Sequence, residues 1–350
     1  MPHPFHTDPA GRIVEVLGAL ETAFRRLHPL AIPRLRDGLR SRVEGLEASL
    51  LQLSERGVPD ADATGLRLLE AGGLVLEALH RFGGGHDMTQ AFMAVLRAMR
   101  SWCRAQEVLY PLSRDFPGID RFFLEPGAIV QWGKNGEIPE SSTGIVHRIP
   151  GEEAYGRGGY SLFVPGVQPS GRPLALVVAL HGGYGHGRDF LWTWLREARS
   201  RGLLLMAPSS AGSTWSLADI ETDAVPLEQH LAEVCSRYAV DQSRILLTGM
   251  SDGGTFALGF GLRSGSPASA VAPVSCVLPP VGLEHARERR IFWVHGAQDW
   301  MFPASRAARA CEELSRAGAE VRLKIVPDLA HAYPREENSA ILGWFAPEPA

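Results

Sequence analysis

A serine between two glycines follows a short apolar run in the second half of the chain. The sequence there is Gly249-Met250-Ser251-Asp252-Gly253, and a helix-compatible stretch comes next. A serine on a sharp strand-to-helix turn holds a strained backbone, and side chains two residues before and after it would collide, so both positions need glycine. The turn also exposes the hydroxyl beside a helix N-terminus. This pattern predicts Ser251 as a nucleophile, and the alternative is a plain glycine-rich turn.

A serine hydroxyl is a weak nucleophile near neutral pH. It needs a base within hydrogen-bond reach, and that base needs an acid to orient it. When a nucleophile lies on a turn of this kind, the acid and then the histidine are expected later in the chain, each after a strand. Asp299 follows the apolar run 290–294, and His331 follows the run 321–326. We therefore predict His331 as the general base and Asp299 as the acid that orients it.

Other acids and histidines lie near these positions. Asp328 is an alternative acid, but its place just before His331 fits a turn or a cap better. His295 ends the strand before Asp299, and we expect it to support that loop. His285 lies in a polar stretch that we expect to be exposed.

Acyl transfer at Ser251 would also need two hydrogen-bond donors for the oxyanion of the tetrahedral intermediate. We expect one donor to be the backbone N–H of Asp252. The other is expected in the glycine-rich loop 181–187, where glycine lets the backbone approach a substrate. Gly183 is the first choice and Tyr184 the second. The alternatives are a loop that needs only tight turns, or a phosphate cradle, whose Gly-Lys-Ser/Thr ending is missing.

The elements that must position these residues alternate from about residue 144 onward. Short apolar runs followed by helical patterns predict an α/β fold, a mainly parallel sheet with helices on both faces. Binding sites on such sheets lie outside the carboxyl ends of the strands, where Ser251 falls. The predicted strands are 145–149, 160–164, 174–180, 203–206, 244–248, 270–274, 290–294 and 321–326. The predicted helices are 190–200, 225–238, 255–262, 305–317 and 335–345.

The first part of the chain has a different pattern. Residues 11 to about 106 carry apolar residues at helical spacing, which predicts four helices in a small bundle. The predicted organisation is an all-α region over 1–106, an irregular connector over 107–143 packed on the next domain, and the α/β domain over 144–350. The role of the helical region stays open between dimerisation, partner docking and a lid.

Composition excludes several classes of protein. The net charge of the 350 residues is −4, so we expect no general attraction to nucleic acid or to an anionic membrane. The first residues have neither a basic n-region nor an apolar h-region, and no apolar stretch approaches the roughly 20 residues of a membrane helix. We therefore expect no targeting signal, no membrane insertion and a cytoplasmic location. The scattered cysteines predict neither a disulfide framework nor a zinc site.

Several segments together resemble the phospholipase/carboxylesterase group of the α/β-hydrolase superfamily, and they are also similar to polyhydroxybutyrate-depolymerase-like esterases. They are 180–185, 207–210, 249–254, 295–299 and His331. The resemblance covers about 150–347 and implies a Ser-Asp-His hydrolase that cleaves carboxylic esters. The region from 1 to about 140 resembles no family. Asp252 departs from the glutamine that is common after the nucleophile in acyl-protein thioesterase relatives.

The sequence thus predicts a carboxylesterase that cleaves a small or medium ester through an acyl-enzyme, with no metal or organic cofactor. Trp215, Trp300 and Met301 are candidates for a shallow substrate pocket, beside Tyr184; ordinary core packing is the alternative. The same residues are compatible with three other functions. They are a prolyl-oligopeptidase-like peptidase, a biosynthetic acyltransferase or thioesterase, and a non-catalytic binding module.

Overall fold

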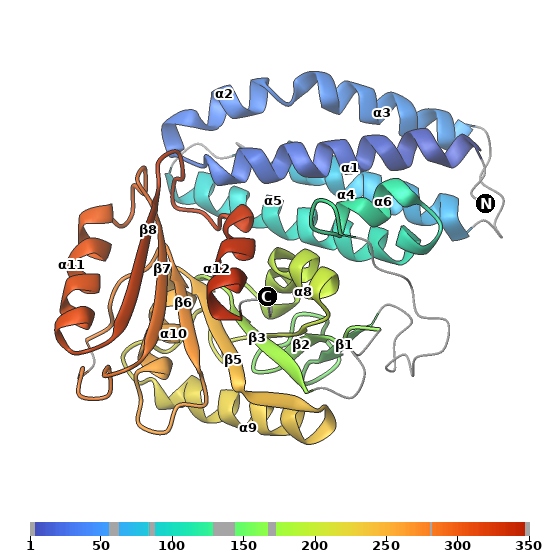
Figure 1. Ribbon diagram of the computed structural model, residues 1–350. Coiled ribbons are helices and arrows are strands. Elements are labelled where there is room, and N and C mark those ends of the chain that lie inside the picture. The colour runs from blue at the N-terminus through green and yellow to red at the C-terminus, as the bar shows by residue number, and fades with distance from the viewer. Residues whose placement is uncertain are drawn as a thin grey trace. The chain divides into compact units, whose positions relative to one another are not determined.

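The chain folds as two compact units, Met1–Val130 and Gln131–Ala350, in the computed structural model (Figure 1). The structure describes residues 4–55, 63–82, 84, 88–128, 144–166, 173–280 and 282–346. Among these residues, none of the helices combines the length and the apolar character needed to cross a membrane.

The first unit is built from helices, as predicted. Their apolar stripes meet in a core that includes Leu17, Leu46 and Leu68, all fully buried. The indole N–H of Trp102 donates to the carbonyl of Leu17 over 3.0 Å, which fixes one helix against another. The four long helices are α1 (Pro4–Arg25), α3 (Arg40–Glu55), α4 (Ala63–Arg81) and α5 (Met88–Leu109), and the short elements are η1 (Pro29–Ala31), α2 (Ile32–Asp37), η2 (Tyr110–Arg114) and α6 (Pro117–Phe122).

In the segment 107–143, expected to be an irregular connector, most of the residues over 107–122 are helical, and residues 123–128 form turns and loop. Its first residues complete α5, and η2 and α6 follow. Over 107–122 the expectation of irregular structure was wrong because it treated the prolines as breakers. Pro111 and Pro117 lie in the first turn of η2 and of α6, where the missing N–H has no helical partner to lose. Residues 129–143 lie outside the described residues.

A mainly parallel sheet of eight strands forms the centre of the second unit (Figure 1). The spatial order is β1-β2-β4-β3-β5-β6-β7-β8, with β2 antiparallel to both of its neighbours and all other pairs parallel. All the predicted strands form. They are β1 (Ile145–Arg148), β2 (Tyr160–Phe163), β3 (Leu174–Leu180), β4 (Leu204–Pro208), β5 (Val240–Met250), β6 (Ala270–Val274), β7 (Arg290–Gly296) and β8 (Glu320–Val326).

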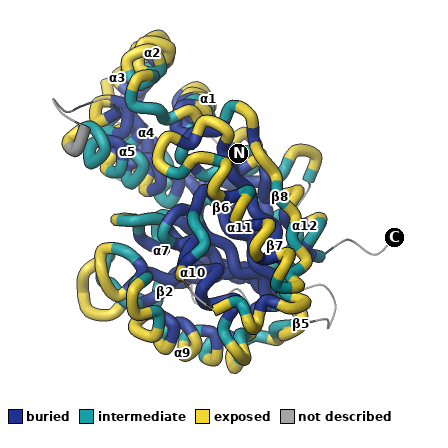
Figure 2. Tube along the Cα trace, turned by 90° about the vertical axis from the view of Figure 1, so that its left-hand side faces the viewer, coloured by how far each residue is buried: buried dark blue, intermediate teal, exposed yellow. Residues whose placement is uncertain are grey.

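Helices cover both faces of this sheet, so the central strands are apolar on both sides; Figure 2 draws them in the dark blue of buried residues. On one face, side chains of β3 and β5 form one cluster with α9, α10 and α11. On the other, Phe292 of β7 packs edge-on against Trp344 of α12. The helices are α7 (Gly187–Phe190), η3 (Leu191–Thr193), α8 (Leu195–Arg201), α9 (Glu221–Arg237), α10 (Asp252–Gly261), α11 (Ala304–Arg316), η4 (Arg335–Glu337) and α12 (Asn338–Phe345).

Candidate active site

Ser251 lies on the turn between β5 and α10, at the carboxyl end of the sheet. Its backbone has φ 55° and ψ −121°, a conformation that L residues rarely adopt and that costs about 1–3 kcal/mol. Two hydrogen bonds of 2.9 Å hold it there. The amide of Ser251 donates to the carbonyl of Val274, and its own carbonyl accepts from the amide of Thr255.

The glycines around Ser251 are required by close backbone contacts. A Cβ on Gly249 would lie 2.5 Å from the carbonyl oxygen of Gly253. A Cβ on Gly253 would lie 2.5 Å from the carbonyl oxygen of Leu180, at the end of the neighbouring strand. The turn therefore packs backbone against backbone, as the sequence pattern predicted.

Replacing Gly253 with alanine should destabilise the second unit by at least about 1–3 kcal/mol, because the new methyl group meets carbonyl groups that cannot move aside. Urea unfolding followed by circular dichroism measures this change. Gly343→Ala is the matched control, since a Cβ on this residue of α12 meets nothing within 4 Å. The control should stabilise by roughly 0.5–1 kcal/mol or be neutral. Equal stability of the two variants would contradict the packing described here.

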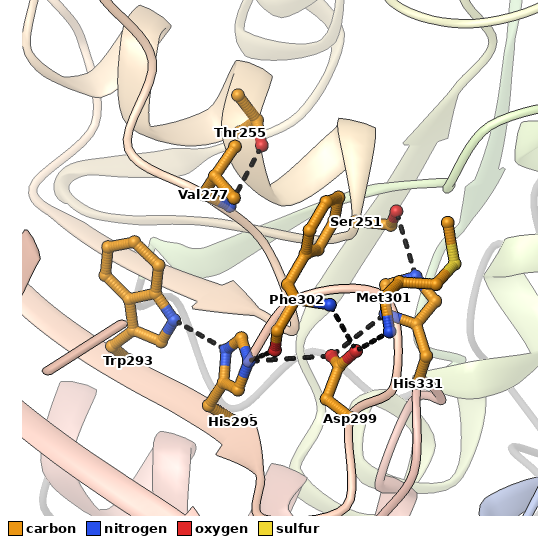
Figure 3. A network of polar contacts seen from close by, with 9 residues as sticks. All are labelled: Ser251, Thr255, Val277, Trp293, His295, Asp299, Met301, Phe302 and His331. Carbon is orange, nitrogen blue, oxygen red and sulfur yellow. Dashed lines mark hydrogen bonds and ion pairs between the residues drawn. The ribbon is translucent and has the colours of Figure 1, made fainter. Parts of the chain in front are cut away.

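Ser251, His331 and Asp299 are joined in a chain of hydrogen bonds (Figure 3). The Nε2 atom of His331 lies 3.1 Å from Oγ of Ser251, and its Nδ1 atom lies 2.9 Å from Oδ2 of Asp299. The other carboxylate oxygen, Oδ1, accepts from the amides of Met301 and Phe302 over 3.0 and 2.8 Å. An ionised Asp299 only accepts hydrogen bonds, so the proton of neutral His331 sits on Nδ1 and Nε2 can accept from the serine hydroxyl.

The surroundings of Asp299 favour its ionised form. Burial alone would raise the pKa of the carboxyl group, but the hydrogen bond and charge interaction with His331, together with the amide of Phe302, hold it below its ordinary value. A carboxylate in this position keeps the imidazole of His331 in one orientation.

A second histidine, His295, supports the loop that carries Asp299. Its Nε2 atom donates to the carbonyl of Phe302 over 2.8 Å, and its Nδ1 atom accepts from the indole of Trp293 over 3.4 Å (Figure 3). Burial lowers the pKa of His295, which favours a neutral ring. This geometry agrees with the prediction that His295 supports the loop of Asp299. The ring of Phe302 lies 5.3 Å from the ring of His331. This contact was not predicted, because nothing in the sequence marks Phe302.

The glycine-rich loop after β3 lies against Ser251. A Cβ on Gly182 would be 3.6 Å from Cβ of the serine. The carbonyl of Gly182 accepts from the amide of Gly185 over 3.0 Å and from Nδ1 of His181 over 2.7 Å. The N–H and C=O of a trans peptide point in opposite directions. These two bonds therefore fix the direction of the Gly183 N–H.

Tyr184, the second-choice oxyanion donor, is excluded by the structure. Its amide donates to the carbonyl of Ser213 over 2.8 Å, so this N–H is already used. By contrast, within the part of the chain that the structure describes, the amides of Gly183 and Asp252 donate to no acceptor. The side chain of Asp252 turns to Thr214, whose hydroxyl donates to Oδ2 over 2.5 Å.

The three pocket candidates divide into two kinds. Trp215 is only 3% exposed, stacks on Phe256 at 4.7 Å and donates its indole N–H to the carbonyl of His181 over 2.7 Å. It is a core residue, so its prediction as a pocket residue is wrong. Trp300 and Met301 directly follow Asp299 and are 37% and 39% exposed. Among the described residues, no group of three or more His, Cys, Asp or Glu side chains could hold a metal ion.

A parallel sheet with a serine on a strand-to-helix turn, and with an acid and a histidine after later strands, defines an α/β-hydrolase fold. Residues 217–344 match the family model described as Phospholipase/Carboxylesterase, which confirms the resemblance over these residues. The match does not extend to the helices of the first unit. A comparison with curated proteins finds no match.

Solved structures similar to this chain include three esterases. A thermostable esterase is 21% identical, with 51% of this chain and 52% of that chain covered and a TM-score of 0.42, so the chain spans about half the length of that protein. The esterase PE8 is 22% identical, with 52% and 95% covered and a TM-score of 0.44. An acetyl xylan esterase from Aspergillus awamori is 16% identical, with 53% and 93% covered and a TM-score of 0.47.

Proposed function

We propose that this protein is a serine carboxylesterase. The observation that carries the proposal is the chain of hydrogen bonds from Ser251 through His331 to Asp299. A hydroxyl bonded to the free nitrogen of an imidazole, whose other nitrogen is held by a buried carboxylate, is an activated nucleophile. The match of residues 217–344 to the Phospholipase/Carboxylesterase model supports the same reaction class.

The reaction proceeds in two halves. Oγ of Ser251 attacks the ester carbonyl carbon while its proton passes to Nε2 of His331, and the tetrahedral intermediate then collapses with that proton going to the departing alkoxide. Water, deprotonated by His331, attacks the acyl-enzyme in the second half. The acid leaves and Ser251 recovers its proton. Asp299 keeps the imidazole in the required tautomer and stabilises its positive charge.

The amides of Gly183 and Asp252 are the proposed donors to the oxyanion. Two features support this role. The Gly183 N–H has a fixed direction, because the carbonyl of the same peptide is bonded to His181 and Gly185. The Asp252 N–H opens α10, where unpaired amides and the helix dipole favour negative charge. Donors set in place before the reaction need no reorganisation when charge develops.

Small and medium esters are the proposed substrates. The exposed Trp300 and Met301 next to Asp299, and the exposed side chain of Tyr184 next to Gly183, offer an apolar rim for an acyl or alcohol group. Neither the attack nor the hydrolysis needs a metal or an organic cofactor, because side chains and water supply every proton and nucleophile in the steps above.

The release of p-nitrophenol from acetate, butyrate and octanoate esters tests this function. We expect a burst of one p-nitrophenol per active site, then steady turnover that is slowest for octanoate. Adding hydroxylamine should divert the acyl group without changing the burst. Cleavage of a prolyl p-nitroanilide in the absence of ester turnover would replace the proposal with a peptidase. Absence of turnover on all of these substrates would contradict it.

A further inference from the structure

The loop after β4, residues 209–216, is bonded along its length to the loop that carries Gly183. Four contacts join the two loops, and a fifth, from Thr214, joins the 209–216 loop to Asp252 at the start of α10. They are Gly187 N to Ser209 Oγ at 3.0 Å, Ser210 N to His181 Nε2 at 3.1 Å, Tyr184 N to Ser213 O at 2.8 Å, Thr214 Oγ1 to Asp252 Oδ2 at 2.5 Å, and Trp215 Nε1 to His181 O at 2.7 Å.

These contacts surround the two proposed oxyanion donors. The bond from Tyr184 fixes the peptide that follows Gly183, and the bond from Ser210 holds His181, which in turn fixes the peptide that precedes Gly183. Burial lowers the pKa of His181 to about 3, so its ring stays neutral and can accept from Ser210 at one nitrogen while donating at the other. Thr214 holds the side chain of Asp252, the residue that carries the second donor.

One buried carboxylate bonds to this loop at two points, near its start and at its end. Asp223, in the first turn of α9, is 3% exposed and belongs to no part of the proposed triad. Its Oδ1 atom accepts from the amide of Ala211 and its Oδ2 atom from the amide of Ser216, both over 2.7 Å. Bonds from backbone amides to an ionised carboxylate are about twice as strong as bonds between neutral groups. The helix N-terminus adds further stabilisation of the negative charge.

We propose that Asp223 is a positioning residue for catalysis: it holds the 209–216 loop, and that loop holds the N–H groups of Gly183 and Asp252 in the geometry that binds the oxyanion. This inference rests on the proposed esterase function. Asp223 touches neither the substrate nor the reacting atoms. Removing the carboxylate of Asp223 should therefore weaken the stabilisation of the transition state more than the binding of the ground-state substrate.

The variant Asp223→Asn removes one of the two loop bonds, because an amide has a single acceptor oxygen. We expect kcat for p-nitrophenyl butyrate to fall on the order of 10²-fold, the cost of displacing one oxyanion donor, with little change in KM. Asp219→Asn is the matched control. This variant removes the same charge close to the start of α9. The carboxylate of Asp219 is exposed, however, and accepts from Thr222, which lies outside the loop. The control should keep the wild-type kcat.

A second readout separates positioning from general destabilisation. A trifluoromethyl ketone forms a tetrahedral adduct with a serine nucleophile, and its oxyanion needs the same donors. Its inhibition constant should rise in Asp223→Asn by about the factor by which kcat falls, while the inhibition constant of the matching methyl amide, a ground-state analogue, stays the same. Equal rises for both inhibitors, or wild-type values of kcat and of the ketone constant, would overturn the proposal.

If Asp223→Asn does not fold, Thr214→Val carries the test. Valine keeps the shape of threonine but cannot donate to Asp252. A lower kcat together with weaker ketone binding supports the positioning role of the loop, and unchanged values overturn it. Failure of the esterase function itself is distinguishable, because the wild type would then show no ester turnover, or turnover that does not depend on Ser251.

Discussion

Replacing Ser251 with alanine is expected to lower kcat for p-nitrophenyl butyrate on the order of 10⁴- to 10⁶-fold. The reason is that no other hydroxyl is bonded to Nε2 of His331 in the described structure. Steady-state kinetics over a range of butyrate ester concentrations, with the burst measured separately, gives both the loss of turnover and the loss of acylation. Thermal unfolding should be unchanged, because alanine keeps the Cβ and the same positive φ.

Ser275→Ala is the control for this variant. Ser275 also has a positive φ, 44°, at the end of the neighbouring strand β6, and within the described residues its buried hydroxyl has no hydrogen-bond partner. This variant should keep the wild-type kcat. Comparable losses in both variants would show that the strained strand ends, and not the Ser251 hydroxyl, account for the effect.

Replacing Asp299 with asparagine is expected to lower kcat about 10⁴-fold, with KM little changed. The amides of Met301 and Phe302 require an acceptor oxygen, so the asparagine would keep its oxygen on them and turn its NH₂ group to His331. Nδ1 would then have to accept a hydrogen bond, the proton would move to Nε2, and the base would lose the lone pair that faces Ser251. Steady-state kinetics with p-nitrophenyl butyrate measures the loss.

Asp328 provides the comparison, since it is the acid nearest to His331 in sequence. Nδ1 of His331 is bonded to Asp299, so Asp328→Asn should leave kcat within about threefold of the wild type. A large loss in Asp328→Asn with activity retained in Asp299→Asn would reverse the assignment of the acid.

The parts of the fold and site that follow local rules were predictable from the sequence. Steric exclusion around Ser251 shows directly in the glycines at 249 and 253, and strands buried on both faces show as continuous apolar runs. His331 and Asp299 could be predicted because each lies in the loop that follows a strand, and the carboxyl ends of parallel strands lie at one edge of the sheet.

Features that depend on contacts between distant segments could not be predicted. Whether the amide of Tyr184 is available depends on the carbonyl of Ser213, and whether Trp215 lines a pocket depends on its stacking with Phe256. The loop bonds of Asp223 were missed for the same reason, since an acid in the first turn of a helix looks like an ordinary favourable charge.

Covalent labelling of the nucleophile tests the proposed active site most directly. The protein is treated with one equivalent of a fluorophosphonate, and the adduct is counted by intact mass and located by peptide mass spectrometry. We expect one adduct per chain, located on Ser251, formed in step with the loss of esterase activity and absent from Ser251→Ala. An adduct on another residue of the wild type, or labelling of Ser251→Ala, would contradict this assignment.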